Sequence, residues 1–407
     1  MLVLTSPSNN QPFQRNQQNY AKVTFVGSSN ETLSIVATPI KSGKATILDH
    51  IQPDSTNNFR STLTLLAGDY NVVVSNSKDI ITLKVNVGDI FAIMGHSFTE
   101  GNGFGYVQDE RVICPDSFFS PMIDTTLYQN CGFVPMKSLS LENAKNYENA
   151  DSVNFSKTRG IWGKLGDMLV ERYNCPVCFY NGGFGGTTIE QWALSAENKS
   201  FQHSFADWSK RMPIVKFMNI LKYVVPRTGL RGVISIHGDN DIAQKPSANQ
   251  VADWYKTIIE VCRKESGFNN LHFVLSPSAY TSEFAQNVID GTIKATQENK
   301  NVLLGAEIYK YPVEYRMSAN DFHLSPTGDT KAAQDFASIL GTESYLLNTI
   351  PVVVGEDEQV INVTSNLAPT IQNTLTFKYS KYVFAGLIFL AFTIAVWLIK
   401  AFSTSKT

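Results

Sequence analysis

The sequence predicts a three-layer α/β/α domain with a mostly parallel sheet, preceded by a small all-β sandwich domain and followed by a hydrophobic C-terminal helix. Three observations predict this arrangement. Short β-branched runs fill residues 1–88, continuous apolar runs alternate with amphipathic segments over residues 89–342, and one uncharged apolar run lies near the C-terminus. A chain of 407 residues is long enough for two or three such domains.

Residues 1–88 are predicted to form a β-sandwich of immunoglobulin-like shape. The expected strands are short and rich in Val, Ile and Thr, and turn signals such as Gly68-Asp69 separate them. Their sequences are KVTFVG, TLSIVAT, STLTLLAG, YNVVVSN and IITLKVNV. No cluster of catalytic residue types is visible in this region, so we expect an accessory domain.

The α/β domain is predicted at residues 89–342. Its first strand is DIFAIM at residues 89–94, a continuous apolar run typical of a strand that is buried on both faces of a parallel sheet. Similar runs follow at PVCFY, GVISI, LHFVL and NVLLG. Amphipathic helical patterns lie between them, for example at residues 161–173 and 249–264. The polar segment over residues 98–158 has little periodicity and is expected to form functional loops.

A membrane anchor is predicted at residues 381–400, after a polar stalk over residues 343–380. About 18 residues, YVFAGLIFLAFTIAVWLI, lie without a charge between Lys381 and Lys400, enough to span a hydrocarbon core at about 1.5 Å rise per residue. A helix buried in an oligomeric assembly is the alternative. We expect a membrane-anchored protein at a cell surface or virion envelope. The lysines on both sides leave the membrane side of the protein body open, and the oligomeric state is not predicted.

The charge and the cysteines exclude two classes of function. The formal net charge is only -2, so no basic excess is present to bind a polyanion and no nucleic-acid partner is expected. Cys175 and Cys178 have CxxC spacing, but no second pair of zinc ligands follows at a usable distance. We therefore expect both to be small apolar strand residues.

Candidate functional residues follow the ends of the predicted strands. Ligands bind outside the carboxyl ends of the strands in a sheet of this type. The relevant segments are Gly95-His96-Ser97, the glycine cluster at residues 182–186 and His237-Gly238-Asp239-Asn240-Asp241. Farther along, Asp321 and His323 precede a helix that is expected to begin at Ser325 and Pro326.

These residue types in this order indicate nucleophilic catalysis by serine. A serine hydroxyl needs a base as it attacks, and a histidine base needs an acceptor that fixes its orientation. His96, His237 and Asp241 could instead indicate a metal site, but they lack the HxH or HExxH pattern. No metal and no cofactor is therefore expected.

The glycine cluster is not a phosphate loop. It lacks a following Lys-Ser or Lys-Thr and the GxGxxG register of a dinucleotide site. Its backbone is expected to approach a reacting oxygen instead. Thr187 and Thr188 are expected to cap the helix that carries Trp192.

Four blocks of the sequence resemble the SGNH/GDSL hydrolase superfamily. They are IMGHS, GGFGGTTIEQW, IHGDND and DFHLSPTG, and they are most similar to the carbohydrate-esterase branch with its sialate O-acetylesterases and acetylxylan esterases. The resemblance covers about residues 89–342. It implies a flavodoxin-like sheet and a carbohydrate O-acetylesterase that needs no cofactor and acts on an acetylated glycan.

The resemblance implies a role for each block. Ser97 would be the nucleophile, and His323 would be the general base, oriented by Asp321. The oxyanion donors would be the N–H groups of Ser97 and Gly185 and the side-chain amide of Asn240, with Gly186 as the alternative to Gly185. The residues expected to bind the substrate are His96, Gly186, Thr187, Trp192 and His237.

The chain departs from the superfamily pattern at three points. His96 stands where Asp or Gln is usual, and Phe98 stands where the branch often has Asn. The last block has Asp-x-His spacing instead of the common Asp-x-x-His, which would place Asn320 in the acidic position. Positions i and i+2 of an extended segment project to the same side, so Asp321 is the expected partner of His323 and Asn320 the alternative.

Two functions fit these observations. The first is a serine esterase that removes O-acetyl or similar short acyl groups from carbohydrate through an acyl-enzyme. The second is a hydrolase-like surface or structural protein of a virus or cell envelope that binds glycans with little or no catalysis.

Overall fold

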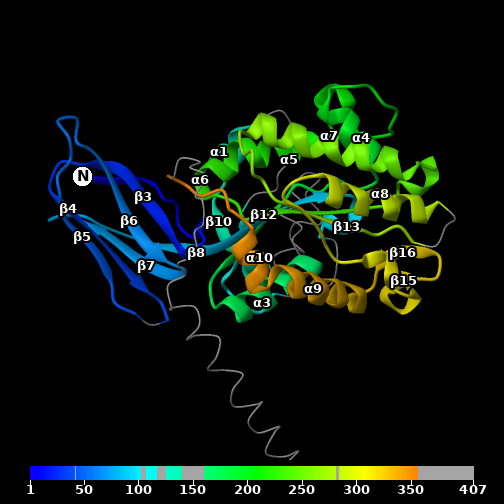
Figure 1. The fold of residues 1–407 in the computed structure, drawn as a ribbon. Coiled ribbons are helices and arrows are strands. Elements are labelled where there is room, and N and C mark those ends of the chain that lie inside the picture. Colours follow the sequence, from blue (N-terminus) through cyan, green and yellow to red (C-terminus); the bar gives the residue numbers. More distant parts are fainter. Residues whose placement is uncertain (42, 102–106, 117–124, 140–159, 281–283, 356–407) are drawn as a thin grey trace, which may run out of the picture. The chain divides into compact units, whose positions relative to one another are not determined.

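The structure is a computed structural model. It describes residues 1–41, 43–101, 107–116, 125–139, 160–280 and 284–355. The chain up to Gly355 forms one compact unit, in which a β-rich N-terminal part is followed by a mixed α/β part (Figure 1).

The N-terminal part consists of two sheets around one core. The first sheet has the order β1-β3-β6 and is antiparallel, with strands β1 (Leu2–Ser6), β3 (Tyr20–Ser29) and β6 (Asn58–Leu66). The second contains β2 (Gln11–Gln14), β4 (Leu33–Pro39), β5 (Thr46–Ile51) and β7 (Gly68–Ser75), and it continues into strand β8. Buried and half-exposed residues alternate along β3, so one face of the strand packs on the shared core, as expected for a sandwich.

Strand β8 (Ile80–Gly95) belongs to both parts of the chain. Its first half pairs with β7 in antiparallel orientation and, from Val85 to Gly88, with β2 in parallel orientation. Its second half pairs in parallel with the neighbouring strands of the α/β sheet. The boundary expected at residue 88 therefore falls within one continuous strand.

The α/β sheet has the strand order β10-β9-β11-β8-β12-β13-β14. Its further strands are β9 (Val112–Pro115), β10 (Phe133–Pro135), β11 (Val177–Asn181), β12 (Gly232–His237), β13 (Phe273–Pro277) and β14 (Val302–Leu304). Every neighbouring pair of these strands is parallel except β10 with β9, so this part agrees with the predicted mostly parallel sheet. Through β8 the sheet continues into the antiparallel strands β4, β5 and β7, so the whole 11-stranded sheet is mixed. Without the β9–β10 hairpin the order becomes 2-1-3-4-5, which is the flavodoxin-like order.

Helices cover both faces of this sheet (Figure 1). Alternate residues of β8 separate the two apolar cores: Ile90 and Ala92 pack with one set of helices, and Phe91 and Ile93 pack with the other. The first set comprises α4 (Ile189–Ala196), α5 (Ile214–Asn219), α6 (Val225–Thr228), α7 (Ala248–Ser266) and α8 (Ala285–Glu298), with α1 (Thr126–Asn130) beside them. The second set comprises α3 (Ile161–Tyr173), α9 (Pro326–Leu340) and α10 (Glu343–Asn348). The α/β part therefore has three layers.

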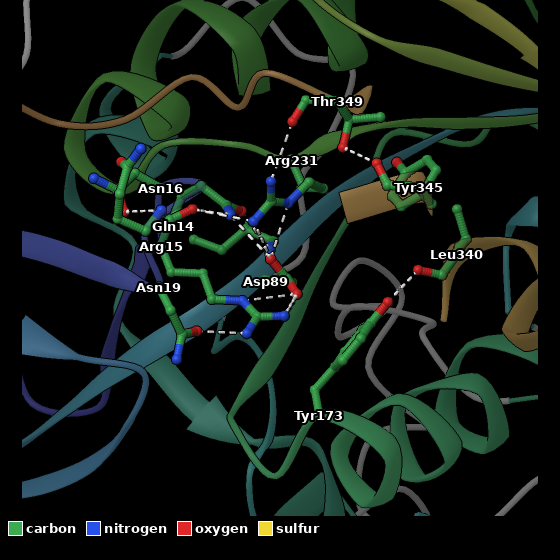
Figure 2. A network of polar contacts seen from close by, with 12 residues as sticks. Gln14, Arg15, Asn16, Asn19, Asp89, Tyr173, Arg231, Leu340, Tyr345 and Thr349 are labelled. Carbon is green, nitrogen blue, oxygen red and sulfur yellow. Dashed lines mark hydrogen bonds and ion pairs between the residues drawn. The ribbon is translucent and has the colours of Figure 1, made fainter. Parts of the chain in front are cut away.

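A buried charge network joins the two parts of the chain (Figure 2). Asp89, which has no exposed side-chain surface, accepts hydrogen bonds from Arg15 Nη2 at 2.6 Å, Arg231 Nη2 at 2.8 Å and Gln14 Nε2 at 3.0 Å. Burial alone would raise the pKa of Asp89, but the two guanidinium groups hold it well below its usual range. Arg231 also donates to the backbone oxygen of Thr349 at 3.3 Å, just after α10, which lies in residues predicted as stalk.

The prediction of a membrane anchor is corrected. Among the described residues, no helix combines the length and the apolar character needed to cross a bilayer. The span expected at residues 381–400 lies outside the described residues. An apolar run of about 18 residues is a sequence pattern at the lower limit of a span. We therefore withdraw the transmembrane helix and the membrane-anchored localisation.

Candidate active site

The turn after β8 places Ser97 at the carboxyl end of the sheet. Gly95 has φ +136°, and a Cβ there would lie 2.2 Å from the backbone oxygen of Ile236, so only glycine lets β8 lie this close to β12. Ser97 begins a short 3₁₀ turn that ends at Thr99. The backbone oxygen of Thr99 accepts hydrogen bonds from Trp162 Nε1 at 3.0 Å and from Asn181 Nδ2, at the end of β11, at 2.8 Å. The turn that carries Ser97 is therefore fixed from two sides.

Ser97, His323 and Asp321 form one chain of hydrogen bonds. Ser97 Oγ lies 2.9 Å from His323 Nε2, and His323 Nδ1 lies 2.7 Å from Asp321 Oδ1. A carboxylate only accepts, so Nδ1 carries the proton and Nε2 is left to accept from the serine hydroxyl. His323 and Asp321 are about half-exposed, with 43% and 44% of their side-chain surfaces accessible, so substrate and water can reach the histidine.

A β-hairpin holds this histidine in place. It consists of β15 (Arg316–Ser318) and β16 (Asp321–Leu324). The buried guanidinium of Arg316 donates to the backbone oxygens of Phe322 and Ile308, both at 2.8 Å. Helix α9 then begins with Ser325 as N-cap and Pro326 at its first position, which confirms the predicted helix start.

Asn320 does not take the place of Asp321 beside the imidazole. Its backbone N–H donates to Ser318 Oγ at 3.3 Å in the tight end of the hairpin. Among the described residues, no hydrogen bond joins its side chain to His323, whereas Asp321 accepts hydrogen bonds from both the ring and the backbone of that histidine. Of the two orienting residues weighed from the sequence, the geometry favours Asp321.

A pocket of about 320 Å³ opens beside Ser97. It is lined by Ser97, Glu100, Gly183, Phe184, Gly185, Gly186, Phe205 and Lys216. Within the glycine loop, the N–H of Gly183 donates to the Asn181 side chain and the N–H of Phe184 donates to Gly95 O, both at 2.8 Å. Among the described residues, no protein group accepts from the N–H of Gly185 or of Ser97. These two donors are therefore available to a ligand in the pocket.

A buried lysine donates a hydrogen bond to the backbone of the glycine loop. Lys216 on α5 is only 4% exposed, and its Nζ donates to the backbone oxygen of Gly183 at 3.1 Å. Sequence reasoning missed this residue. A signal was present, because Lys216 is a single charge within the otherwise apolar run PIVKFM, and a buried charge needs a polar partner.

The third sequence block is tied to the second. Asn240 Nδ2 donates to the backbone oxygen of Thr187 at 3.0 Å, which leaves its second amide hydrogen for another acceptor. Asp241 Oδ1 accepts from the backbone N–H of Ile189 at 2.6 Å, and Thr188 caps the same end of α4, as predicted. Burial raises the pKa of Asp241 to about 8, so its carboxyl is largely protonated at neutral pH.

Four of the residues expected to bind substrate are buried and do not line the pocket. His96, Thr187, Trp192 and His237 have no exposed surface, whereas Gly186 is exposed and lines the pocket. Trp192 Nε1 donates to Thr187 Oγ1 at 2.9 Å. The His237 ring packs edge-on against the His96 and Trp192 rings, with centroids 5.6 and 5.7 Å apart. These four side chains therefore have no exposed surface with which to contact a ligand.

Burial also keeps the two inner histidines neutral. It lowers the pKa of His96 to about 3 and that of His237 well below its usual value. Asp239, to which the sequence analysis assigned no role of its own, has Oδ2 3.9 Å from His96 Nε2, and burial raises its pKa to about 7. In the part of the chain that the structure describes, no group of His, Cys, Asp or Glu is arranged to hold a metal ion.

The five cysteines are buried and free of disulfide bonds. Cys178 lies within β11, and Cys175 precedes the same strand by two residues. Burial raises the pKa of both thiols, which disfavours the reactive thiolate. Both cysteines are therefore small apolar residues at the sheet, as expected from the sequence.

Solved structures of several esterases resemble this chain. A carbohydrate acetylesterase from Xanthomonas citri matches with a TM-score of 0.49 and 15% identity, over 82% of this chain and 74% of its own. A family 3 carbohydrate esterase from Clostridium thermocellum matches with a TM-score of 0.33 and 15% identity, over 62% of this chain and 94% of its own. A protein described as a lipolytic member of the G-D-S-L family, from Desulfitobacterium hafniense, matches with a TM-score of 0.29 and 13% identity, over 61% and 97%.

Two of these proteins are named as carbohydrate esterases and the third as a G-D-S-L family protein. The four sequence blocks resemble the same branch and superfamily. Neither a protein-family model nor the sequence of a curated protein matches the chain.

Proposed function

We propose that this protein is a serine esterase that removes O-acetyl or similar short acyl groups from carbohydrate. The observation that supports the proposal most directly is the chain of hydrogen bonds from Ser97 Oγ through His323 to Asp321, at 2.9 and 2.7 Å, beside an open pocket. Nucleophile, base and orienting acid within hydrogen-bond reach are what acyl transfer by serine requires.

In the first half of the reaction Ser97 Oγ attacks the ester carbonyl carbon. His323 Nε2 takes the hydroxyl proton as the new C–O bond forms, and Asp321 stabilises the imidazolium that results. The tetrahedral intermediate then collapses, and the imidazolium returns the proton to the departing sugar oxygen. The products are the free sugar hydroxyl and an acyl group on Ser97.

The oxyanion of the intermediate needs hydrogen-bond donors on the pocket side of Ser97. We assign this role to the N–H groups of Ser97 and Gly185 and to the side-chain amide of Asn240. The first two have no acceptor among the described residues, and Asn240 keeps one amide hydrogen. Loss of one such donor typically costs about 2.7–4 kcal/mol of barrier.

In the second half of the reaction water replaces the sugar. His323 takes a proton from the water as its oxygen attacks the acyl carbon. The intermediate then collapses, the imidazolium returns the proton to Ser97 Oγ, and the carboxylic acid is released. The assignment of a short acyl group and of an acetylated glycan as substrate follows from the resemblance of the four sequence blocks to carbohydrate esterases.

Replacement of the nucleophile tests this proposal. Ser97→Ala removes the attacking oxygen, and hydrolysis of p-nitrophenyl acetate is expected to fall to the uncatalysed background. Circular dichroism and thermal melting of the variant should match the wild type, because Ser97 is a half-buried turn residue. Unchanged turnover in a folded variant would rule out Ser97 as the nucleophile. Glycan binding without turnover in the wild type would favour a binding protein instead.

A further inference from the structure

We propose that Phe205 and Glu100 form a subsite for the sugar ring of the substrate, on the side of the pocket built by the glycine loop. The inference rests on the esterase function proposed above and names the part of the site that selects the leaving alcohol. Phe205 would stack on the carbon–hydrogen face of the ring, and Glu100 would accept hydrogen bonds from its hydroxyl groups.

Phe205 is an exposed aromatic ring that is held in a defined position. Of its surface, 60% is exposed, and it lines the same pocket as Ser97. Its ring stacks on Phe184 with centroids 6.1 Å apart and an interplanar angle of 18°. The ring of His203 lies nearly perpendicular to it, with centroids 4.4 Å apart and an interplanar angle of 86°. A ring held on two sides loses little freedom when a ligand binds.

His203 fastens the Phe205 segment to the glycine loop. Its Nδ1 accepts from the backbone N–H groups of Phe205 and Ala206 at 3.2 and 2.9 Å. The proton therefore lies on Nε2, which donates to the backbone oxygen of Gly186 at 3.0 Å. Hydrogen bonds through His203 thus connect the segment of the aromatic ring to the loop that supplies the proposed oxyanion donor. They restrain the position of the ring relative to that donor.

Glu100 lies against Gly185, the neighbour of Gly186 in the glycine loop. A Cβ at Gly185 would lie 2.6 Å from Glu100 Oε2, and a Cβ at Gly186 would lie 2.8 Å from the Phe205 ring. Two consecutive glycines thus let a carboxylate and an aromatic ring approach the backbone side by side. A side chain at either position would push one of them away from the pocket.

These two groups match the two surfaces of a sugar. The face of an aromatic ring carries partial negative charge and attracts the weakly positive C–H groups on one face of a pyranose. A carboxylate only accepts hydrogen bonds and pairs with hydroxyl donors, and hydrogen bonds to charged groups are the stronger ones. An alkyl or aryl alcohol offers at most one of these surfaces, so the pair favours a hydroxyl-bearing sugar ring as the leaving group.

The test compares two acetate esters that differ only in their alcohol. Methyl 6-O-acetyl-glucopyranoside carries the sugar ring, and ethyl acetate offers nothing for the subsite to bind. Phe205→Ala and Glu100→Gln are each expected to lower kcat/KM for the sugar ester about tenfold. In each variant the fall in kcat/KM should be at least about fivefold larger for the sugar ester than for ethyl acetate, because ethyl acetate has no ring to bind in the subsite. Phe205→Leu keeps an apolar contact with Phe184 but removes the π face, and should behave like Phe205→Ala.

Matched controls lie nearby in the chain. Trp208 is another exposed aromatic residue, 41% accessible, and Glu197 is an exposed carboxylate at the end of α4; neither lines the pocket. Trp208→Ala and Glu197→Gln should leave both rates unchanged. An equal fall for both esters, or no fall for the sugar ester, in the Phe205 and Glu100 variants would overturn the subsite while the esterase stands. A wild-type protein that hydrolyses neither ester contradicts the esterase and the subsite with it.

Discussion

Asp321 Oδ1 accepts two hydrogen bonds from His323, one from the ring Nδ1 at 2.7 Å and one from the backbone N–H at 2.9 Å. The two residues are separated by one position on β16, and alternate residues of a strand project to the same side. One carboxylate oxygen therefore fixes both the backbone and the ring of the histidine. These hydrogen bonds also lower the pKa of Asp321, which keeps the carboxylate ionised as an acceptor.

Asp321→Asn should lower kcat by roughly 10³–10⁴-fold, because an amide in this place can donate to Nδ1 and select the wrong tautomer. KM should change little, since Asp321 does not contact the pocket. Steady-state kinetics with p-nitrophenyl acetate measures both constants. Asn320→Ala, one residue away, is the control and should keep nearly full activity. The opposite ranking of the two variants would assign the orienting role to Asn320.

Lys216 should act as a positioning residue of the glycine loop. Lys216→Met removes the donor to Gly183 O, and the N–H of Gly185 is then expected to lose its fixed direction. We expect kcat to fall about tenfold or more, with KM changed less than twofold, because misaligned oxyanion donors weaken the transition state. Lys216→Arg keeps a cationic donor and should recover part of kcat. Equal loss in Met and Arg variants, or a rise in KM alone, would argue against this role.

Asp241→Asn should change how stability depends on pH. Burial raises the pKa of Asp241 from its ordinary value of 3.8 to about 8, so between these values the folded protein holds a proton that the unfolded chain releases. Stability therefore falls as pH rises from about 4 to about 8. The variant lacks this titration. Its free energy of unfolding minus that of the wild type should therefore increase with rising pH, by up to about 1.4 kcal/mol per pH unit.

Urea unfolding at pH 5, 6, 7 and 8 measures this difference. Asp239, whose pKa burial raises to about 7, contributes to the pH dependence of both proteins. Asp253→Asn on the exposed side of α7 is the matched control and should follow the wild type. Parallel pH profiles for the wild type and Asp241→Asn would contradict the prediction.

Arg231→Met should destabilise the whole unit by about 3–5 kcal/mol, because it leaves the buried carboxylate of Asp89 with only one of its two guanidinium partners. Urea unfolding measures the loss, and both parts of the chain should unfold in one transition. Glu307→Gln is the control. It breaks a surface pair with Lys310, whose side chain is 58% exposed, and such a pair contributes about 0–1 kcal/mol. A loss of similar size in both variants would show that the network adds little.

Local patterns in the sequence predicted most of the α/β part. The apolar run at residues 89–94 lies within β8, the amphipathic pattern at residues 161–173 coincides with α3, and the cap at Ser325 and Pro326 begins α9. Each of these features depends on the chemistry of neighbouring residues. The β9–β10 hairpin was missed because its short strands lie in a polar segment without clear periodicity.

Site residues that belong to a sequence motif could be predicted. Site residues that reach the pocket only through tertiary packing could not. Ser97, Asp321 and His323 follow from their blocks, and the structure brings them together. Lys216 and Phe205 reach the pocket from an α-helix and a loop outside every block, so their sequence neighbours do not reveal the contact. Trp192 and His237 likewise are fully buried and do not line the pocket, although they belong to two of the blocks.

Strand β8 has a consequence for how this chain can be divided. Its 16 residues span roughly 50 Å at about 3.3 Å per residue. The serine that follows it lies at the end of a strand that also pairs with β2 and β7 of the N-terminal part. The β-rich part therefore cannot be separated from the α/β part without cutting β8. A deletion or exchange that cuts at residue 88 splits one strand and removes Arg15 and Gln14 from Asp89. Fusions and chimaeras of this protein should treat residues 1–355 as a single building block.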